Sequence, residues 1–120
     1  MNIAIKATNM ELTPAIEDYV RKRFEGLKKF IKGDDDEVKP MVEVGKTSRH
    51  HKKGDFFRAE ISLRAGGKSL YAASEKADLY AAIDDVKEEI ERELLSQKTK
   101  RIDTARRMGA KIKNSIKNIQ

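Results

Sequence analysis

The basic side chains near the end of the chain are the residues whose type and spacing most clearly predict a chemistry. Residues 96–120 contain eight Lys or Arg side chains and one carboxylate, which gives this segment a charge of +7. Because the whole chain has a net charge of +6, residues 1–95 sum to −1. A charge excess confined to one segment indicates a polyanionic partner, such as the phosphates of a nucleic acid. The cations of this segment that we expect to contact phosphate are Lys98, Lys100, Arg101, Arg106, Arg107, Lys111 and Lys113.

Two other interpretations of the same segment stay open. A solvated end that keeps the protein soluble would have the same charge. An anionic membrane surface would also attract it, because a thin apolar line at helical spacing runs along the basic residues. This line lacks the Trp, Phe and Leu side chains that anchor such helices, so we expect no membrane partner. Its members are Ala105, Met108, Ile112, Ile116 and Ile119.

Two further clusters contain residue types that bind metals. His50 and His51 are flanked by three cations, which oppose a dication, so a phosphate-facing or solvated loop is the favoured interpretation. The acidic run 34–37 lacks the spacing of ligands around a glycine that an EF-hand loop requires, and we expect a solvated turn. The chain has no cysteine, which excludes thiolate ligands and disulfides. We therefore expect neither a metal nor a cofactor.

The chain also lacks the residue patterns of an enzyme. It has no Walker loop, no H-E-x-x-H motif and no candidate Ser-His-Asp set. Asp84 and Asp85 are consecutive on a predicted helix and point about 100° apart, so they cannot act together as an acid/base pair. A metal-dependent nuclease that uses His50, His51 and the acidic turn is a remote alternative. We expect no catalytic residues and no small-molecule substrate.

The start of the chain has no basic leader followed by an apolar stretch, and the longest apolar run, 79–83, is too short to cross a bilayer. These patterns favour a cytoplasmic protein.

The elements that must position these residues can be predicted from hydrophobic periodicity. Residues 2–8 alternate between apolar and polar side chains, which predicts a half-buried strand. Thr13 and Pro14 predict the start of a helix, because Thr can cap a helix and Pro is favoured at the first helical position. We expect this helix to end at Gly33. Its apolar stripe, which leaves the cations Lys22, Lys28 and Lys29 on another side, consists of Ile16, Tyr19, Val20, Phe24, Leu27 and Ile31.

Three strands and a second helix follow in the predicted order. Val42 and Val44 share one strand face, residues 57–64 alternate clearly, and Gly66-Gly67 forms a hairpin turn before a strand over 69–73. A long helix begins near residues 76–78, with a stripe at Leu79, Ala82, Ile83, Val86, Ile90 and Leu94, and Tyr80 lies one residue off it, where it could cover the sheet edge. The predicted class is α+β, with the order β-α-β-β-β-α and two helices on one face of a four-stranded mixed sheet. Strands 1 and 2 would be parallel, and strands 2 to 4 antiparallel.

Three stretches of this sequence resemble the ribosome hibernation-promoting factors, also called ribosome-associated inhibitors or ribosomal subunit interface proteins. They are the segment from Ile3 through the link Glu11-Leu12-Thr13, the segment from Phe57 through the Gly-Gly hairpin to Ser74, and the run Asp78-Leu79-Tyr80-Ala81-Ala82-Ile83-Asp84. The last is the most specific. The resemblance covers about residues 1–101, which we expect to form one domain followed by a basic amphipathic tail at 102–120.

The resemblance implies a fold similar to a double-stranded-RNA-binding domain. It also implies binding to the small ribosomal subunit and its rRNA, in the channel shared by mRNA and tRNA, with inhibition of translation under stress. Family contacts come from basic residues of both helices. By position these are Lys22, Arg23, Lys28 and Lys29 in the first helix, and Arg92, Lys98 and Lys100 in the second. Position 89, commonly Lys in the family, is Glu89 here, which makes that turn more acidic.

The function expected from the sequence is therefore ribosome hibernation by a monomeric, non-enzymatic protein. A general RNA-binding or RNA-chaperone module that uses the same basic tail is the alternative. Selective co-sedimentation with small subunits would separate the two.

Overall fold

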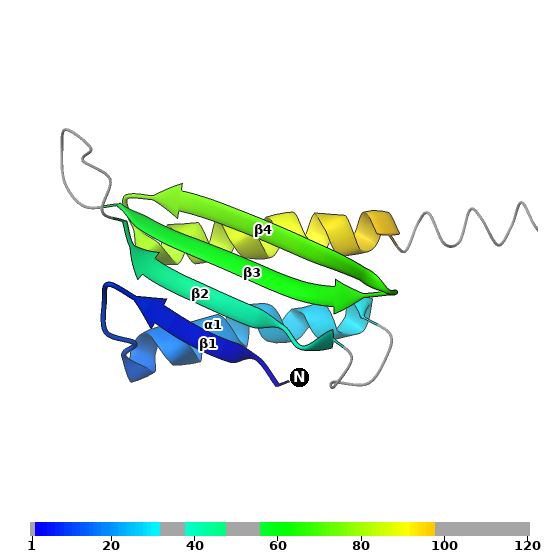
Figure 1. Cartoon of the computed structure of the whole chain (residues 1–120), viewed down its shortest axis with the longest axis horizontal. Coiled ribbons are helices and arrows are strands. Elements are labelled where there is room, and N and C mark those ends of the chain that lie inside the picture. The colour runs from blue at the N-terminus through cyan, green and yellow to red at the C-terminus, as the bar shows by residue number, and fades with distance from the viewer. Residues whose placement is uncertain (1, 32–37, 48–55, 98–120) are drawn as a thin grey trace, which may run out of the picture.

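The computed structural model describes residues 2–31, 38–47 and 56–97. In chain order they form β1 (Ala4–Thr8), α1 (Pro14–Glu25), the 3-10 helix η1 (Gly26–Phe30), β2 (Met41–Lys46), β3 (Phe57–Ala65) and β4 (Lys68–Lys76). A second long helix follows at residues 79–97. The four strands form one sheet in the order β1-β2-β3-β4, and both long helices lie on the same side of it (Figure 1). The predicted α+β class and element order are confirmed.

The first helix begins where the sequence predicts. The Thr13 hydroxyl accepts a hydrogen bond from the backbone N–H of Ile16 at 3.2 Å, and Pro14 occupies the first helical position. Ile16, Val20 and Phe24 are buried at a spacing of four residues, so one side of α1 faces the sheet. Full burial of a side chain such as Phe24 stabilises the fold by about 1.5–3 kcal/mol.

The predicted end of this helix at Gly33 is wrong. The α-helix ends at Glu25, the chain tightens into η1, and Ile31 is extended at φ −112° and ψ 122°. Gly26 lies at the change, where its conformational entropy weakens the α-helix. The tighter turns of η1 still bury Leu27 completely, so they maintain the core while the chain turns toward β2.

The sheet has one covered and one open face. β1 and β2 are parallel, with Ile5 opposite Val42, whereas β2, β3 and β4 are antiparallel. The predicted strand directions are thus confirmed. The β3–β4 hairpin turns through Gly66 and Gly67, whose φ angles of 58° and 78° suit glycine. β4 is longer than the predicted 69–73, because its pairing with β3 continues to Lys76 opposite Phe57.

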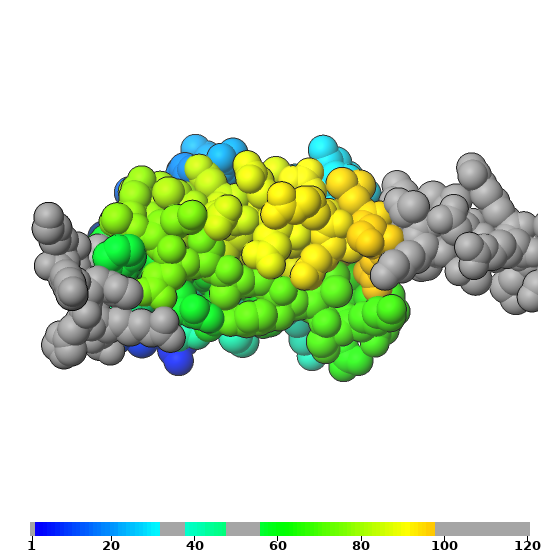
Figure 2. All heavy atoms as spheres, turned by 90° about the horizontal axis from the view of Figure 1, so that it is seen from above, coloured from blue at the N-terminus to red at the C-terminus, as the bar shows by residue number. Residues whose placement is uncertain are grey.

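The hydrophobic core lies between the sheet and the helix layer. All six predicted stripe residues of the second helix are buried, as are Val42, Val44, Ile61 and Leu63 from the sheet. Viewed from above, the second helix forms a ridge along the sheet, with parts of α1 and η1 visible beyond it (Figure 2). On the opposite, open face, Met41 and Tyr71 are 54% and 51% exposed. No helix within the described residues is long and apolar enough to cross a membrane.

Candidate nucleic-acid interface

The cations of α1 and η1 lie on the outer side of the first helical segment. Lys22, Arg23, Lys28 and Lys29 are all exposed, while Phe24 and Leu27 between them are buried. The prediction that Lys22, Lys28 and Lys29 avoid the apolar stripe is therefore confirmed, because helical spacing separates the two sets. Their proposed contact with RNA stays a prediction. Together they present four positive charges within about two helical turns of chain.

Lys22 and Lys29 differ from each other in their surroundings. The Lys22 ammonium lies 3.0 Å from a carboxylate oxygen of Asp18, one turn earlier on the same helix, and both side chains are more than half exposed. Such an exposed pair contributes little to stability and restrains the lysine weakly. The Lys29 ammonium lies 5.1 Å from the centre of the Phe30 ring. Each of these lysines therefore remains accessible to a phosphate.

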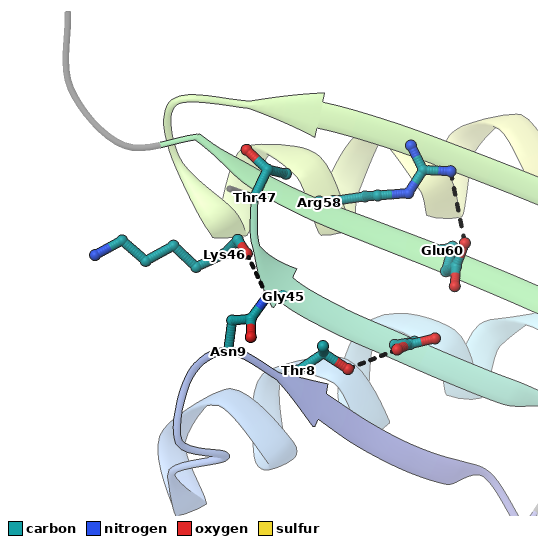
Figure 3. Close-up of a pocket in the computed structure, with 8 residues that line it drawn as sticks. Thr8, Asn9, Gly45, Lys46, Thr47, Arg58 and Glu60 are labelled. Carbon is teal, nitrogen blue, oxygen red and sulfur yellow. Dashed lines mark hydrogen bonds and ion pairs between the residues drawn. The ribbon is translucent and has the colours of Figure 1, made fainter. Parts of the chain in front are cut away.

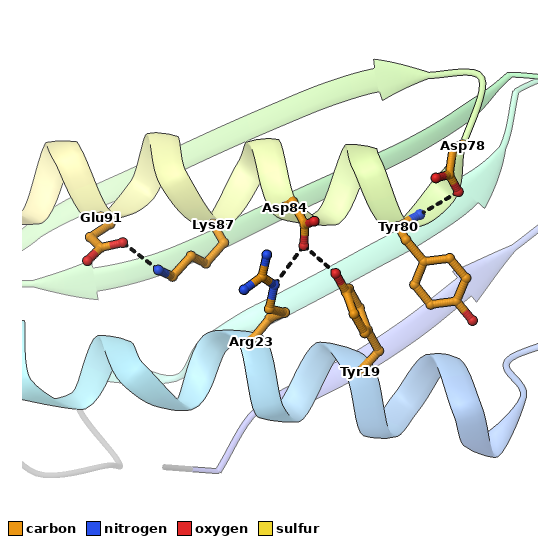
Figure 4. Close-up of polar contacts among 7 residues, drawn as sticks. All are labelled: Tyr19, Arg23, Asp78, Tyr80, Asp84, Lys87 and Glu91. Carbon is orange, nitrogen blue, oxygen red and sulfur yellow. Dashed lines mark hydrogen bonds and ion pairs between the residues drawn. The ribbon is translucent and has the colours of Figure 1, made fainter.

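Arg23 has a different partner, which comes from the second helix. Its Nε donates to Oδ1 of Asp84 at 2.7 Å, and the Tyr19 hydroxyl donates to the same oxygen at 2.5 Å (Figure 4). The Arg23 hydrogen bond is the main cause of the lowered pKa of Asp84, while the hydrogen bond to Asp84 raises the pKa of Tyr19. The sequence predicted no chemistry for Asp84 and did not reveal this partner, since the contact joins residues that are 61 positions apart.

Tyr80 completes this cluster. Its ring packs edge-on against Tyr19, with ring centres 4.7 Å apart and planes at 88°. The second helix lies beside α1, so a position one residue off its buried stripe faces that helix (Figure 4). The predicted cover of the sheet edge by Tyr80 stays a prediction. Arg23 also lies 5.8 Å from the centre of the Tyr19 ring. Tyr19, Arg23, Tyr80 and Asp84 form the interhelical cluster.

The outer side of the second helix is mostly acidic. Residues 79–97 contain two cations, Lys87 and Arg92, and six carboxylates. Lys87 is paired with Glu91 at 2.6 Å, and each of these side chains is only 24% exposed. Burial, and then the charge of Glu89, raise the pKa of Glu93. Arg92 is exposed, as its predicted role requires, but carboxylates surround it in the sequence.

Several predicted features lie outside the described residues. They include the histidine pair at 50–51, the acidic run 34–37 and the proposed tail domain at 102–120. Within the part of the chain that the structure describes, no group of three or more His, Cys, Asp or Glu residues could hold a metal ion. The predicted phosphate-binding cations that also lie outside are Lys98, Lys100, Arg101, Arg106, Arg107, Lys111 and Lys113.

A hollow of about 300 Å³ lies on the open face of the sheet, near the ends of β1 and β2 (Figure 3). Thr8 donates to Glu43 at 2.6 Å, a contact that is the main cause of the lowered pKa of Glu43. Arg58 donates to the Tyr71 hydroxyl at 2.9 Å, and this hydroxyl donates to Glu60 at 2.6 Å. The polar groups of neighbouring strands thus satisfy one another, and this hollow is best explained as part of the sheet's own stabilisation.

Comparison with known proteins gives consistent similarities. Residues 3–102 match the family model described as Sigma 54 modulation protein / S30EA ribosomal protein. The chain is 30% identical to a ribosome hibernation promoting factor of Klebsiella oxytoca, over 83% of this chain and 96% of that protein. A protein of the same name from Acinetobacter guillouiae is 32% identical, over 86% and 92%. The N-terminal domain of Protein Y from Thermus thermophilus superposes with a TM-score of 0.60 at 34% identity, over 78% of this chain and 96% of that domain.

Proposed function

Because the chain belongs to the Sigma 54 modulation protein / S30EA ribosomal protein family, we propose that it is a ribosome hibernation factor. In this proposal the protein binds the small ribosomal subunit in the channel used by mRNA and tRNA. It stops translation under stress because those ligands cannot bind at the same time. The protein acts as a monomer in the cytoplasm and catalyses no reaction. The names of its relatives support the hibernation role.

The observation that supports the binding surface best is the exposed row of cations on α1 and η1. Lys22, Lys28 and Lys29 project away from the core, and Arg23 lies among them at the contact with the second helix. Phosphate contacts of this kind fix the position of a protein on RNA without reading its sequence. The +7 charge of residues 96–120 adds long-range attraction to the same polyanion.

The acidic second helix constrains how the protein would lie on rRNA. A surface with six carboxylates and two cations opposes phosphate, so the middle of this helix would face away from the RNA backbone. The contact would then be one-sided, through α1, η1 and the residues after 97. This arrangement differs from one in which both helices contribute equally.

Co-sedimentation with purified small subunits tests the proposal. We expect the protein to sediment with small subunits and whole ribosomes, to be displaced by mRNA together with tRNA, and to inhibit peptide synthesis in vitro. If about six cations contact phosphate, log Kd should change with log salt with a slope on the order of 4. A ribosome that continues to synthesise peptide at full rate with the protein bound would contradict the proposal.

The same experiment addresses the alternative of a general RNA-binding or RNA-chaperone module. The charge concentrated in residues 96–120 favours this alternative, because clustered cations bind any phosphate backbone. A duplex RNA and an unrelated folded RNA serve as competitors. Equal affinity for all three RNAs, with no effect of mRNA and tRNA on binding, would favour the general module over the hibernation factor.

A further inference from the structure

The two arginines of α1 that lie two residues apart use their nitrogens differently. Arg21 donates from Nη1 to the carbonyl of Ile3 at 3.1 Å and from Nη2 to Glu17 at 3.0 Å. Both terminal nitrogens of its guanidinium group are therefore occupied within the fold, one by the residue that precedes β1 and one by α1 itself. Arg23 donates from Nε to Asp84, and hydrogen bonding to Asp84 and then to Tyr19 raises its pKa, while no hydrogen bond of its Nη1 or Nη2 is found among the described residues. Arg23, unlike Arg21, retains the two terminal nitrogens that bind an anion.

We infer that Asp84 is a positioning residue, which holds Arg23 by its Nε so that Nη1 and Nη2 are presented to a phosphate of the bound rRNA. The inference rests on the proposed function and adds to it a role for a carboxylate. A guanidinium group binds phosphate well through two parallel N–H donors, and this geometry is available only if the side chain is correctly oriented. The Arg23 side chain is 45% exposed, so its outer edge is accessible.

The surroundings of Asp84 suit this role. Tyr19 donates its hydroxyl to the same oxygen that Arg23 uses, and the ring of Tyr19 is held by Tyr80 from the second helix (Figure 4). The Asp84 side chain is 35% exposed and is bonded to two residues of α1, whereas Asp18 is 62% exposed and is paired with Lys22 on its own helix. Ordering a long side chain before binding removes part of the entropy cost of the complex.

The inference and simple electrostatics predict opposite effects on binding when the charge of Asp84 is removed. Removal of a negative charge near bound phosphate should tighten binding if charge alone matters. If Asp84 positions Arg23, the variant Asp84→Asn should instead bind small subunits roughly threefold to tenfold more weakly, as expected when one long side chain is no longer ordered. The matched control is Asp18→Asn, which removes a carboxylate from α1 without affecting Arg23 and should bind equally well or slightly better.

A double-mutant cycle separates positioning from a general structural effect. The dissociation constants for small subunits are measured for Asp84→Asn, Arg23→Gln and the double variant, below the unfolding temperature of each. We expect Asp84→Asn to have no further effect once Arg23 is replaced. Tyr19→Phe removes one hydroxyl from the interhelical cluster, preserves the ring and should show a smaller loss that likewise disappears with Arg23→Gln. This second variant tests the inference if Asp84→Asn folds poorly.

The outcomes distinguish a failure of the proposed function from a failure of the role inferred for Asp84. If the unchanged protein does not bind small subunits, both the proposed function and this inference are overturned. If it binds, but the folded Asp84→Asn or Tyr19→Phe variant binds as tightly as the unchanged protein, only the inference is wrong. An equal loss from Asp84→Asn with and without Arg23 would also overturn it.

Discussion

The two helical segments that cover the sheet have similar apolar sides and opposite charges. Residues 14–30, which form α1 and η1, contain five cations and three carboxylates, whereas residues 79–97 contain two cations and six carboxylates. The first segment has a net charge of +2 and the second of −4. Both bury one stripe against the same sheet, so the core does not require this difference. The difference belongs to the outer surface of the helix layer.

This contrast shows that two helical segments can pack on the sheet in the same way and still present different surfaces to a partner. The buried stripes fix where both helices lie, while the outer residues decide which of them can approach a polyanion. The interhelical cluster is the place where the two surfaces meet, and there one carboxylate of the acidic segment pairs with one cation of the basic segment. The first helical segment is thus the better candidate for RNA contact.

Reversal of the charge of the first helical segment should weaken binding more than any other change proposed for this protein. We expect Lys28→Glu/Lys29→Glu to weaken binding to small subunits by about a hundredfold, since two phosphate contacts become repulsions of roughly 1 kcal/mol or more each. The matched control is Lys6→Glu/Arg64→Glu, which makes the same charge change on the open face of the sheet, where both side chains are exposed. Equal losses in the two variants would mean that net charge, rather than the surface of η1, governs binding.

A second test examines the contact that joins the two segments. The pKa of Asp84 is below its ordinary value in the folded protein, mainly because of Arg23, so ionised Asp84 stabilises the fold at neutral pH. This contribution is lost as the pH falls through the folded-state pKa. Because the pair is partly exposed and screened by solvent, we expect it to be worth about 1 kcal/mol or less at pH 7.

Urea unfolding of the unchanged protein and of Asp84→Asn, from pH 7 down to pH 3, measures this contribution. The free energies of unfolding should differ at pH 7 and converge in acid. A difference that does not depend on pH would show that the carboxylate acts through packing rather than through its charge.

The sequence predicted those parts of this arrangement that depend on neighbours along the chain. Thr13 and Pro14 mark the start of α1 because a cap is a local feature, and alternation marked the strand faces because its period is two residues. The end of α1 was missed because the change at Gly26 depends on how Leu27 fits the core. The family resemblance selected Arg23 as a candidate RNA contact, but its pairing with Asp84 depends on the relative rotation of two helices. Periodicity within one helix does not contain that information.

A smaller effect on binding is expected from the acidic middle of the second helix. Glu88 and Glu89 lie in the acidic middle of this helix, and Glu89 also raises the pKa of Glu93. We expect Glu88→Gln/Glu89→Gln to tighten binding to small subunits by about threefold at low salt, because it removes a repulsion that acts over roughly a Debye length. The effect should fade above about 0.3 M salt, where that length is shorter.

The variant Glu89→Lys extends this test, since a cation at the same position would add attraction instead of only removing repulsion. If the middle of the second helix faces away from the RNA, Glu89→Lys should tighten binding hardly more than Glu89→Gln, because the side chain is too far from phosphate for a direct contact. A gain of tenfold or more from the lysine alone would place this turn against the RNA and would contradict a one-sided contact. Glu11→Lys, at an exposed position between β1 and α1, makes the same charge change outside both helices and serves as the control.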